Sequence, residues 1–404
     1  MNVLLINKFF YPRGGAETVF LEERKQLINR GLNVIDFSMH HPENIGSPYS
    51  DDFLPNVDYQ QPSTSPLTNP LRLVHNRQAA ATLHSLIQKH QPEIAHLHNT
   101  YHQLTPSILK PLQKAGIPIL LTLHDYKIAC PVYTMRRPGD KTCSRCATGS
   151  TLDTIRFQCK DGSVGKSALL ALESGWHRFR RSYNRVTTFI APSQFMKTTI
   201  AKTGVPEDKI CVLHNGTPPQ APAPRLNPEG HALYFGRLSE EKGLTTLIKA
   251  MAELRSDTQL RIVGTGPLHN QLEKSAGPNI VFRGHLTGTA LHSEIQSSGF
   301  VIVPSEWNEN CSMTVIESLA SRKPVIASSI GGLPEQVSHE KDGLLFPPGD
   351  TNALAFAIDR LATDHDLRNR LAENALATYT SKFHIDTHMD RLLALYNTTL
   401  QEHA

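Results

Sequence analysis

The sequence has 404 residues, of which 39% are hydrophobic and 19% are charged. This composition excludes intrinsic disorder and predicts two or three globular domains. The net charge of +4, from 41 basic and 37 acidic residues, is too small to indicate a nucleic-acid-binding protein. No apolar run approaches the roughly 18 residues of a membrane span. The apolar start lacks a basic segment and a cleavage site, so we interpret it as a strand. Six cysteines are too few for a disulfide scaffold, and we expect a cytoplasmic protein.

Along the first half, short apolar runs alternate with helical patterns, which is typical of βαβ units around a parallel sheet. The run at 1–7 predicts a strand, a turn with Gly14 and Gly15 follows, and the next pattern predicts a helix that ends at Gly31. Apolar residues at 83–87 predict another helix. Further strands are predicted at 33–38, 94–98, 117–123, 188–191 and 210–213.

Five prolines between 218 and 228 predict a linker, because such a stretch forms neither a helix nor a central strand. The alternation then restarts, with a helix over 243–254. Strands are predicted at 232–235, 260–263, 280–282, 300–303 and 324–327. We therefore expect an α/β protein with two doubly wound domains that face a central cleft, at 1–217 and 229–384, joined by the linker at 218–228.

Two carboxylates mark the segment from 301 to 345. Glu309 lies in a loop after a predicted strand, and Glu317 lies inside the helix that follows. We expect Ser312 or Asn310 to cap that helix, so that its first N–H groups and positive dipole end can receive an anion. The simpler alternative is a helix-start charge and a solvated helix face.

A second turn, at 236–243, carries two cations between a strand and a helix. A guanidinium and an ammonium at Arg237 and Lys242 suit a diphosphate. The alternative is a pair of surface salt bridges to Glu240 and Glu241. Neither Gly264-Thr265-Gly266 nor the Gly14-Gly15 loop matches Gly-x-Gly-x-x-Gly, which disfavours a dinucleotide-dependent dehydrogenase.

Together these residues resemble a known family. The carriers are Gly236-Arg237-Leu238 with Lys242-Gly243, the segment 309–317, Lys323-Pro324-Val325-Ile326-Ala327, Gly331-Gly332-Leu333-Pro334-Glu335, the Gly14-Gly15-Ala16-Glu17 loop and Thr122-Leu123-His124-Asp125. They look like a retaining glycosyltransferase of family 4 over nearly the whole chain. The resemblance implies a GT-B architecture of two Rossmann-like domains, an acceptor-binding and a nucleotide-sugar-binding one, with a C-terminal helix at 385–404 that crosses back to the first domain.

The resemblance also implies roles for single residues. Arg237 and Lys242 would bind the diphosphate, and Glu317 would bind the ribose hydroxyls. The catalytic residues implied are His124 and Glu309, both near the donor sugar. The remaining donor-binding residues implied are Gly15, Asn310, Cys311, Ser312 and Met313, the last four around a phosphate at the helix start. One departure is Ser321-Arg322, where a small residue such as Gly often stands in the family, so we expect that loop to be shaped differently.

The chemistry suits these residues. Departure of a nucleoside diphosphate builds negative charge, which fixed cations and a helix N-terminus stabilise. Because no Asp-x-Asp metal-binding pair stands out, we predict metal-independent catalysis without a catalytic cofactor. His124 resembles a substrate-positioning residue more than a general base, and a strand-end histidine satisfied locally is the alternative. His96 and His98 are weaker candidates for the same cleft.

Four cysteines lie in one loop, at 130–159. Cys143 and Cys146 form a C-x-x-C pair, and Cys130 and Cys159 flank it. Four thiolates in a loop with little apolar material suit a structural zinc ion. Four reduced thiols, a redox-active pair and an iron–sulfur cluster are the alternatives.

A local basic cluster interleaved with aromatics occupies a predicted helix near 176–185. Its residues are Trp176, His177, Arg178, Phe179, Arg180, Arg181, Tyr183 and Arg185. It suits an anionic membrane surface, where a lipid-linked acceptor would reside. The alternative is a helix that packs its aromatic side into the core and solvates its basic face.

The function expected from the whole pattern is transfer of a sugar from a UDP-, GDP- or ADP-sugar to a glycan or lipid-linked glycan, in polysaccharide or lipopolysaccharide assembly, without a nucleic-acid partner. We expect the protein in the cytoplasm, peripheral at the inner membrane face. A nucleotide-sugar 2-epimerase, a zinc-ribbon nucleic-acid-binding protein and an inactive scaffold are the competing hypotheses. The sequence leaves the donor base, the sugar, the acceptor and the oligomeric state open.

Overall fold

The computed structural model describes residues 1–57, 71–139, 142–220 and 230–403. The chain divides into two compact units, of which the first comprises Met1–Leu213 with Met389–Ala404 and the second comprises His214–His388. Both divisions fall within about four residues of the predicted boundaries at 217 and 384. Most of the predicted linker at 218–228 lies outside the described residues.

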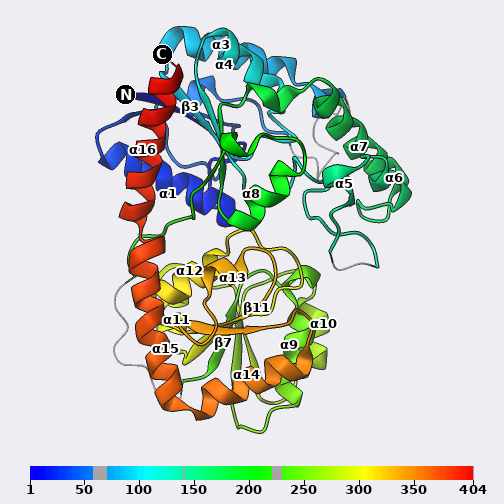
Figure 1. Ribbon diagram of the computed structural model, residues 1–404, viewed down its shortest axis with the longest axis vertical. Helices are drawn as coiled ribbons and strands as arrows, with labels where there is room; N and C mark the ends of the chain where they lie inside the picture. The colour runs from blue at the N-terminus through cyan, green and yellow to red at the C-terminus, as the bar shows by residue number, and fades with distance from the viewer. Residues whose placement is uncertain (58–70, 140–141, 221–229, 404) are drawn as a thin grey trace. The chain divides into compact units, whose positions relative to one another are not determined.

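The first unit is built on a six-stranded parallel sheet (Figure 1). Its order is β2-β1-β3-β4-β5-β6. The strands are β1 (Asn2–Ile6), β2 (Asn33–Phe37), β3 (Ile94–Leu97), β4 (Ile119–Thr122), β5 (Thr188–Ala191) and β6 (Ile210–Val212). Helices α1 (Gly15–Asn29), α3 (Arg77–His90), α4 (Leu109–Lys114), α7 (Val164–Phe179), α8 (Gln194–Ala201) and α16 (Ile385–His403) accompany them. The strands are apolar and almost wholly buried, as parallel strands covered on both faces must be.

The second unit repeats this plan. Its parallel sheet has the order β12-β11-β10-β7-β8-β9. The strands are β7 (Ala232–Phe235), β8 (Leu260–Val263), β9 (Ile280–Gly284), β10 (Phe300–Val303), β11 (Val325–Ser328) and β12 (Gly343–Phe346). The sequence analysis missed β12, a four-residue edge strand that begins with glycine and follows no clear apolar alternation.

Side chains of the second sheet alternate between two separate cores. Tyr234 and Ile302 pack into one, and Leu233 and Val301 into the other. Helices α9 (Leu244–Ala252), α10 (His269–Ser275) and α14 (Thr351–Thr363) contribute to the first core, and α11 (Gly288–Ser297) and α12 (Met313–Ala320) to the second. Helix α15 (His365–Thr378) contributes to both. The two doubly wound α/β units match the predicted fold class.

Each sheet has a topological switch point, where the strand order reverses. It lies between β1 and β3 in the first unit and between β7 and β10 in the second. In such sheets the ends of the strands at this point diverge and leave room for a ligand at their carboxyl edge. Within the described residues, no helix combines the length and apolar character that crossing a bilayer requires.

Candidate functional site

Two loops meet at the switch point of the second unit. One leads from β7 through Arg237 to Lys242, and the other leads from β10 through Pro304 to Glu309. Gly243 has φ +69°, and a Cβ there would lie 1.8 Å from the Pro304 carbonyl oxygen. Only glycine permits both this backbone conformation and this approach, so Gly243 brings the two loops together.

Lys242 and Glu309 form an ion pair between these loops. The Lys242 ammonium donates to Glu309 Oε1 at 2.6 Å, and the Ser305 hydroxyl donates to the same oxygen at 2.6 Å. Glu309 is only 6% exposed. Burial would raise the pKa of its carboxyl, but the Lys242 charge and these hydrogen bonds lower the pKa overall. Lys242 therefore pairs with Glu309 and not with Glu240 or Glu241.

Arg237 and Glu317 are the charged residues of this site that have no ion pair with another described residue. Arg237 is exposed on the loop after β7. Glu317 is half-buried on α12, where burial raises the pKa of its carboxyl to about 7. A guanidinium and a carboxylate without protein partners are available to a ligand's phosphate and hydroxyl groups.

The start of α12 differs from the expected cap. Ser312 occupies the N-cap position, but its side chain makes no capping hydrogen bond. Its backbone N–H instead donates to Gln336 Oε1 at 2.7 Å, which removes this N–H from the predicted phosphate cradle. The N–H groups of Met313 and Thr314, in the first turn, have no acceptor within the helix. Asn310 is buried beside them, and burial raises the pKa of Cys311 to about 12, which makes it an inert thiol.

In the first unit, His124 ends a chain of buried polar side chains. Its Nε2 lies 2.8 Å from His98 Nδ1, and His98 Nε2 lies 3.4 Å from a carboxylate oxygen of Glu23 on α1. His98 Nε2 makes no hydrogen bond to a described residue, so the contact that fixes the orientation of the His124 ring is the one between His124 Nε2 and His98 Nδ1. Burial, with His98, lowers the pKa of His124 to about 3. His124 is then neutral near pH 7 and a weak base, which favours positioning over proton transfer.

His96, by contrast, has structural partners. Its Nδ1 lies 2.7 Å from the Tyr396 hydroxyl and its Nε2 lies 2.7 Å from the Thr122 hydroxyl. Glu23, His96 and His98 form the one group of three possible metal ligands found among the described residues. His96 is hydrogen-bonded through both ring nitrogens, whereas His98 Nε2 makes no hydrogen bond to a described residue and lies 3.4 Å from the Glu23 carboxylate.

A second charged group at the switch point of the first unit was missed. Lys8 lies two residues after the end of β1 and donates to the Tyr101 carbonyl oxygen at 2.6 Å. Burial lowers the pKa of Lys8 to about 8 and raises that of Asp125 to about 6, and burial also raises the pKa of Glu17. In the sequence, the position of Lys8 just after a predicted buried strand was the signal that could have identified this charged group. Gly15, also expected at the donor, begins α1 beside this group.

The four cysteines are free thiols on a loop that contains α5 (Arg145–Thr148) and α6 (Asp153–Arg156). Burial, together with neighbouring cysteines, raises the pKa values of Cys130 and Cys159 to about 11. The four are thus close enough to interact, but among the described residues no three of them bring their sulfur atoms within 4.8 Å of one another. The Arg178 guanidinium holds this loop by hydrogen bonds to carbonyl oxygens, including that of Cys146 at 2.6 Å.

The basic cluster near 176–185 is divided between core and surface. His177 is buried, and Tyr183 packs against the core. Trp176 and Phe179 are 43% and 81% exposed. The aromatic residues of this cluster therefore do not share one buried face.

Comparison with known proteins identifies the family to which the chain belongs. The model described as "Glycosyltransferase Family 4" matches residues 13–221, which is more than half of the chain, and "Glycosyl transferases group 1" matches residues 223–378. The chain belongs to glycosyltransferase family 4.

Curated relatives share part of the chain. An uncharacterised glycosyltransferase of Methanocaldococcus jannaschii is 28% identical over 218 residues, 48% of this chain and 56% of the relative. The O-antigen chain mannosyltransferase C of Escherichia coli is 31% identical over 175 residues, 42% of this chain and 47% of the relative. The matched region spans about half the length of these relatives.

Solved structures share the fold over its full length. Sucrose-phosphate synthase from Thermosynechococcus elongatus matches with a TM-score of 0.72 at 18% identity, covering 99% of both chains. Anabaena HepE in complex with UDP matches with a TM-score of 0.68 at 18% identity, covering 98% of this chain and 100% of that one. The GT-B fold expected for this family-4 chain is confirmed.

Proposed function

We propose that the chain is a retaining glycosyltransferase that moves a sugar from a nucleoside-diphosphate sugar to an acceptor. The observation that carries the proposal is the charge arrangement at the β7–β10 switch point in a member of this family. There the Lys242–Glu309 pair is accompanied by Arg237, which is exposed on the loop after β7, and by Glu317 on α12, which has no ion pair with another described residue. Cleavage of the donor leaves a nucleoside diphosphate, and a fixed cation lowers the energy of the charge that develops on it.

Glu309 limits the positive charge that Lys242 can offer to a bound diphosphate. An ammonium that is already hydrogen-bonded to a carboxylate is held in one position, but part of its charge is compensated. Arg237 lacks such a partner among the described residues and supplies uncompensated positive charge. We propose that Arg237 binds the diphosphate, Lys242 orients it, and Glu317 accepts hydrogen bonds from the ribose hydroxyls.

His124 is proposed to position the donor sugar. The contact between His98 Nδ1 and His124 Nε2 supports this role, because it orients the His124 ring and leaves its Nδ1 for a hydrogen bond with a sugar hydroxyl. His98 is a positioning residue in this scheme. His98 is buried and reaches a ligand only through His124.

The acceptor is proposed to be a glycan or a lipid-linked glycan of a cell-surface polysaccharide or lipopolysaccharide. The E. coli O-antigen mannosyltransferase among the relatives supports this pathway. The exposed Trp176 and Phe179 beside cations support peripheral contact with the inner face of an anionic membrane.

A structural zinc ion is proposed for the four-cysteine loop. The mutual effect of the thiols on their pKa values supports it, and the sulfur atoms would have to approach one another to complete a tetrahedron. Zinc content of the purified wild type should exceed that of Cys143→Ser/Cys146→Ser. Equal and negligible zinc in both would end this proposal.

The experiment that tests the donor site is thermal unfolding with UDP, GDP, ADP or NAD. A ligand that binds only the folded state at a hundredfold excess over its Kd stabilises that state by about 2.7 kcal/mol. We expect one nucleoside diphosphate to raise the Tm of the wild type but not of Glu317→Ala. Glu273→Ala, which removes a carboxylate from the exposed surface of α10, is the matched control and should respond like the wild type.

Analysis of the products after turnover then distinguishes a glycosyltransferase from an epimerase. With an acceptor fraction, we expect release of the nucleoside diphosphate and a product that keeps the anomeric configuration of the donor. Donor consumption that is independent of any acceptor would instead favour an epimerase. No stabilisation by any of the four ligands at millimolar concentration would overturn the donor-site assignment.

A further inference from the structure

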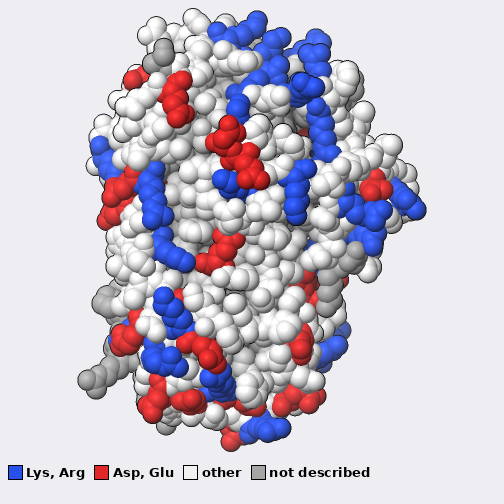
Figure 2. All heavy atoms as spheres, in the orientation of Figure 1, with Lys and Arg blue, Asp and Glu red and all other residues white. Residues whose placement is uncertain are grey.

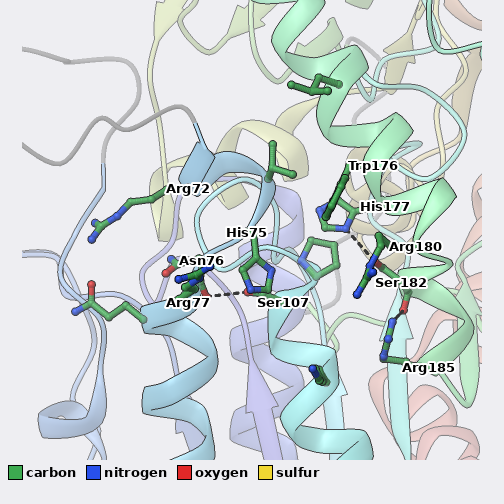
Figure 3. Close-up of a pocket in the computed structure, with 15 residues that line it drawn as sticks. Arg72, His75, Asn76, Arg77, Ser107, Trp176, His177, Arg180, Ser182 and Arg185 are labelled. Atoms are coloured by element: carbon green, nitrogen blue, oxygen red, sulfur yellow. Dashed lines mark hydrogen bonds between the residues drawn. The ribbon is translucent and has the colours of Figure 1, made fainter.

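A cavity in the first unit is unrelated to either switch point. It has a volume of about 960 Å³ and lies between α2 (Leu71–Val74), the start of α3, α4, and the end of α7 (Figure 3). The residues around it come from segments near 72–78, 106–110 and 172–185. None of His98, His124 and Lys8 lines it.

Five cations surround this cavity. In Figure 3, Arg72 and Arg77 lie on one side of His75, and Arg180 and Arg185 lie on the other. Lys110 on α4 is the fifth. Neither Asp nor Glu occurs among the described residues that line the cavity, and none of the five cations has an ion pair with a described residue. Like charges gathered without counter-charges are costly unless an anion joins them.

The electrostatic effect of this cluster is felt by His75. Burial, with Arg77, Lys110 and Arg180, lowers the pKa of its imidazole. Three cations from three different segments therefore act on one exposed imidazole that lines the cavity. Figure 2 shows Lys and Arg gathered at the top of the view, over the part of the first unit that holds α3 and α4.

We propose that this cavity binds a phosphate group. Guanidinium groups match phosphate oxygens in pairs, and the hydrogen bonds of Asn76 and Ser107 within the protein hold the segments that carry Arg77 and Lys110 at the cavity. The inference does not depend on the donor site. A soluble phosphorylated compound and a phospholipid headgroup both carry this chemistry.

The residues at the rim of the cavity are relevant to the phospholipid headgroup as a ligand. Leu172 and Trp176, which line the cavity, are 58% and 43% exposed, and Phe179 beyond them is 81% exposed. Their spacing along α7 places them on one side of the helix. A phosphate held by the cations would thus have apolar side chains next to it, where the lipid tails of a bilayer begin.

Trp176 provides a direct readout. The chain has two tryptophans, and the other, Trp307, lies with its ring 5.4 Å from the Lys242 ammonium. In a Trp307→Phe chain, fluorescence reports Trp176 alone, whose ring lies 5.7 Å from the Arg180 guanidinium. This chain is titrated with inorganic pyrophosphate in one arm. In the other it is titrated with vesicles of phosphatidylcholine, with or without phosphatidylglycerol.

Two charge-matched variants complete the design. Arg77→Gln/Lys110→Gln/Arg180→Gln removes three cations from the cavity. Lys25→Gln/Lys89→Gln/Lys166→Gln removes three exposed lysines of the same unit that lie outside it. We expect a saturable change in Trp176 fluorescence that weakens at least tenfold in the first variant and less than twofold in the second.

A response to pyrophosphate alone supports a soluble ligand. A blue shift with phosphatidylglycerol vesicles that pure phosphatidylcholine does not cause supports a headgroup. The proposal is overturned if neither probe gives a saturable change, or if both triple variants weaken binding equally.

Discussion

Two carboxyl groups on one loop–helix segment are perturbed in opposite directions. Burial raises the pKa of Glu317 to about 7, while for Glu309 the Lys242 charge outweighs burial and the pKa is lowered. Glu309 thus stays ionised as part of a protein ion pair, whereas Glu317 has no protein partner that favours its charge. A carboxylate left in this state is stabilised when a ligand donates hydrogen bonds to it.

Glu317→Gln tests this contrast through stability. Because the folded-state pKa of Glu317 is raised, its contribution is complete below the ordinary value of 4.5 and is lost as pH rises through about 7. The variant has no such loss. We expect it to match the wild type at pH 4.5 and to exceed its free energy of unfolding by about 2 kcal/mol at pH 8. Urea unfolding at both pH values measures this, and a difference that does not change with pH would contradict it.

Lys242→Met tests the ion pair. It leaves the buried Glu309 with the Ser305 hydroxyl but without a counter-charge, so we expect the free energy of unfolding at pH 7 to fall by about 2 kcal/mol. Adding Glu309→Gln should recover most of this loss. Lys249→Met, on the exposed side of α9, is the control. Equal effects of Lys242→Met with and without Glu309→Gln would show that the pair is not coupled.

Arg322 belongs to the one segment, Ser321-Arg322, that departs from the family pattern. It has φ +58°, a left-handed conformation that favours glycine, and its guanidinium pairs with Glu373. Arg322→Gly should relieve about 1 kcal/mol of backbone strain and lose a smaller contribution from a largely exposed ion pair. We expect a slightly higher Tm by calorimetry. A lower Tm would mean that the ion pair dominates.

At the scale of elements, the sequence predicted most of the parallel strands to within two residues, because buried strands are short apolar runs between turn signals. The charged contacts were harder to predict. Lys242 and Glu309 are 67 residues apart and meet because β7 and β10 are neighbours in the sheet, an order that local patterns do not encode. For the same reason, nothing near His124 in sequence indicates its contact with His98.

Helix α16 supplies a buried hydrogen bond to the first unit, and a substitution can test its contribution to stability. Its Tyr396 hydroxyl contacts the buried His96 at 2.7 Å. Tyr396→Phe leaves that ring nitrogen without this partner, and we expect the free energy of unfolding of the first unit to fall by about 1–2 kcal/mol. Chemical unfolding followed by tyrosine and tryptophan signals measures it. In a chain that also carries His96→Ala the additional effect of Tyr396→Phe should vanish, and its persistence would refute the contact.

For the whole molecule, the proposed reaction relies on side-chain and backbone charges. Arg237, Lys242 and the start of α12 supply positive charge without a divalent cation. We therefore expect nucleoside diphosphate release to continue in millimolar EDTA, with circular dichroism showing that the fold persists. Loss of turnover in a folded protein, restored by Mg²⁺ or Mn²⁺, would contradict this. Cys143→Ser/Cys146→Ser separates any effect of zinc loss.

The contact between His96 and Tyr396 also determines when His96 can obtain this hydrogen bond during synthesis of the chain. The two residues are 300 positions apart, and a ribosome that adds about 5–20 residues per second separates them by about 15–60 s. During that interval the central strand β3 of the nascent first unit exists without the residue that completes the hydrogen bonds of His96. The whole second unit is synthesised in the meantime. The hydrogen bonds of His96 in the first unit are thus completed only after the whole second unit has been synthesised.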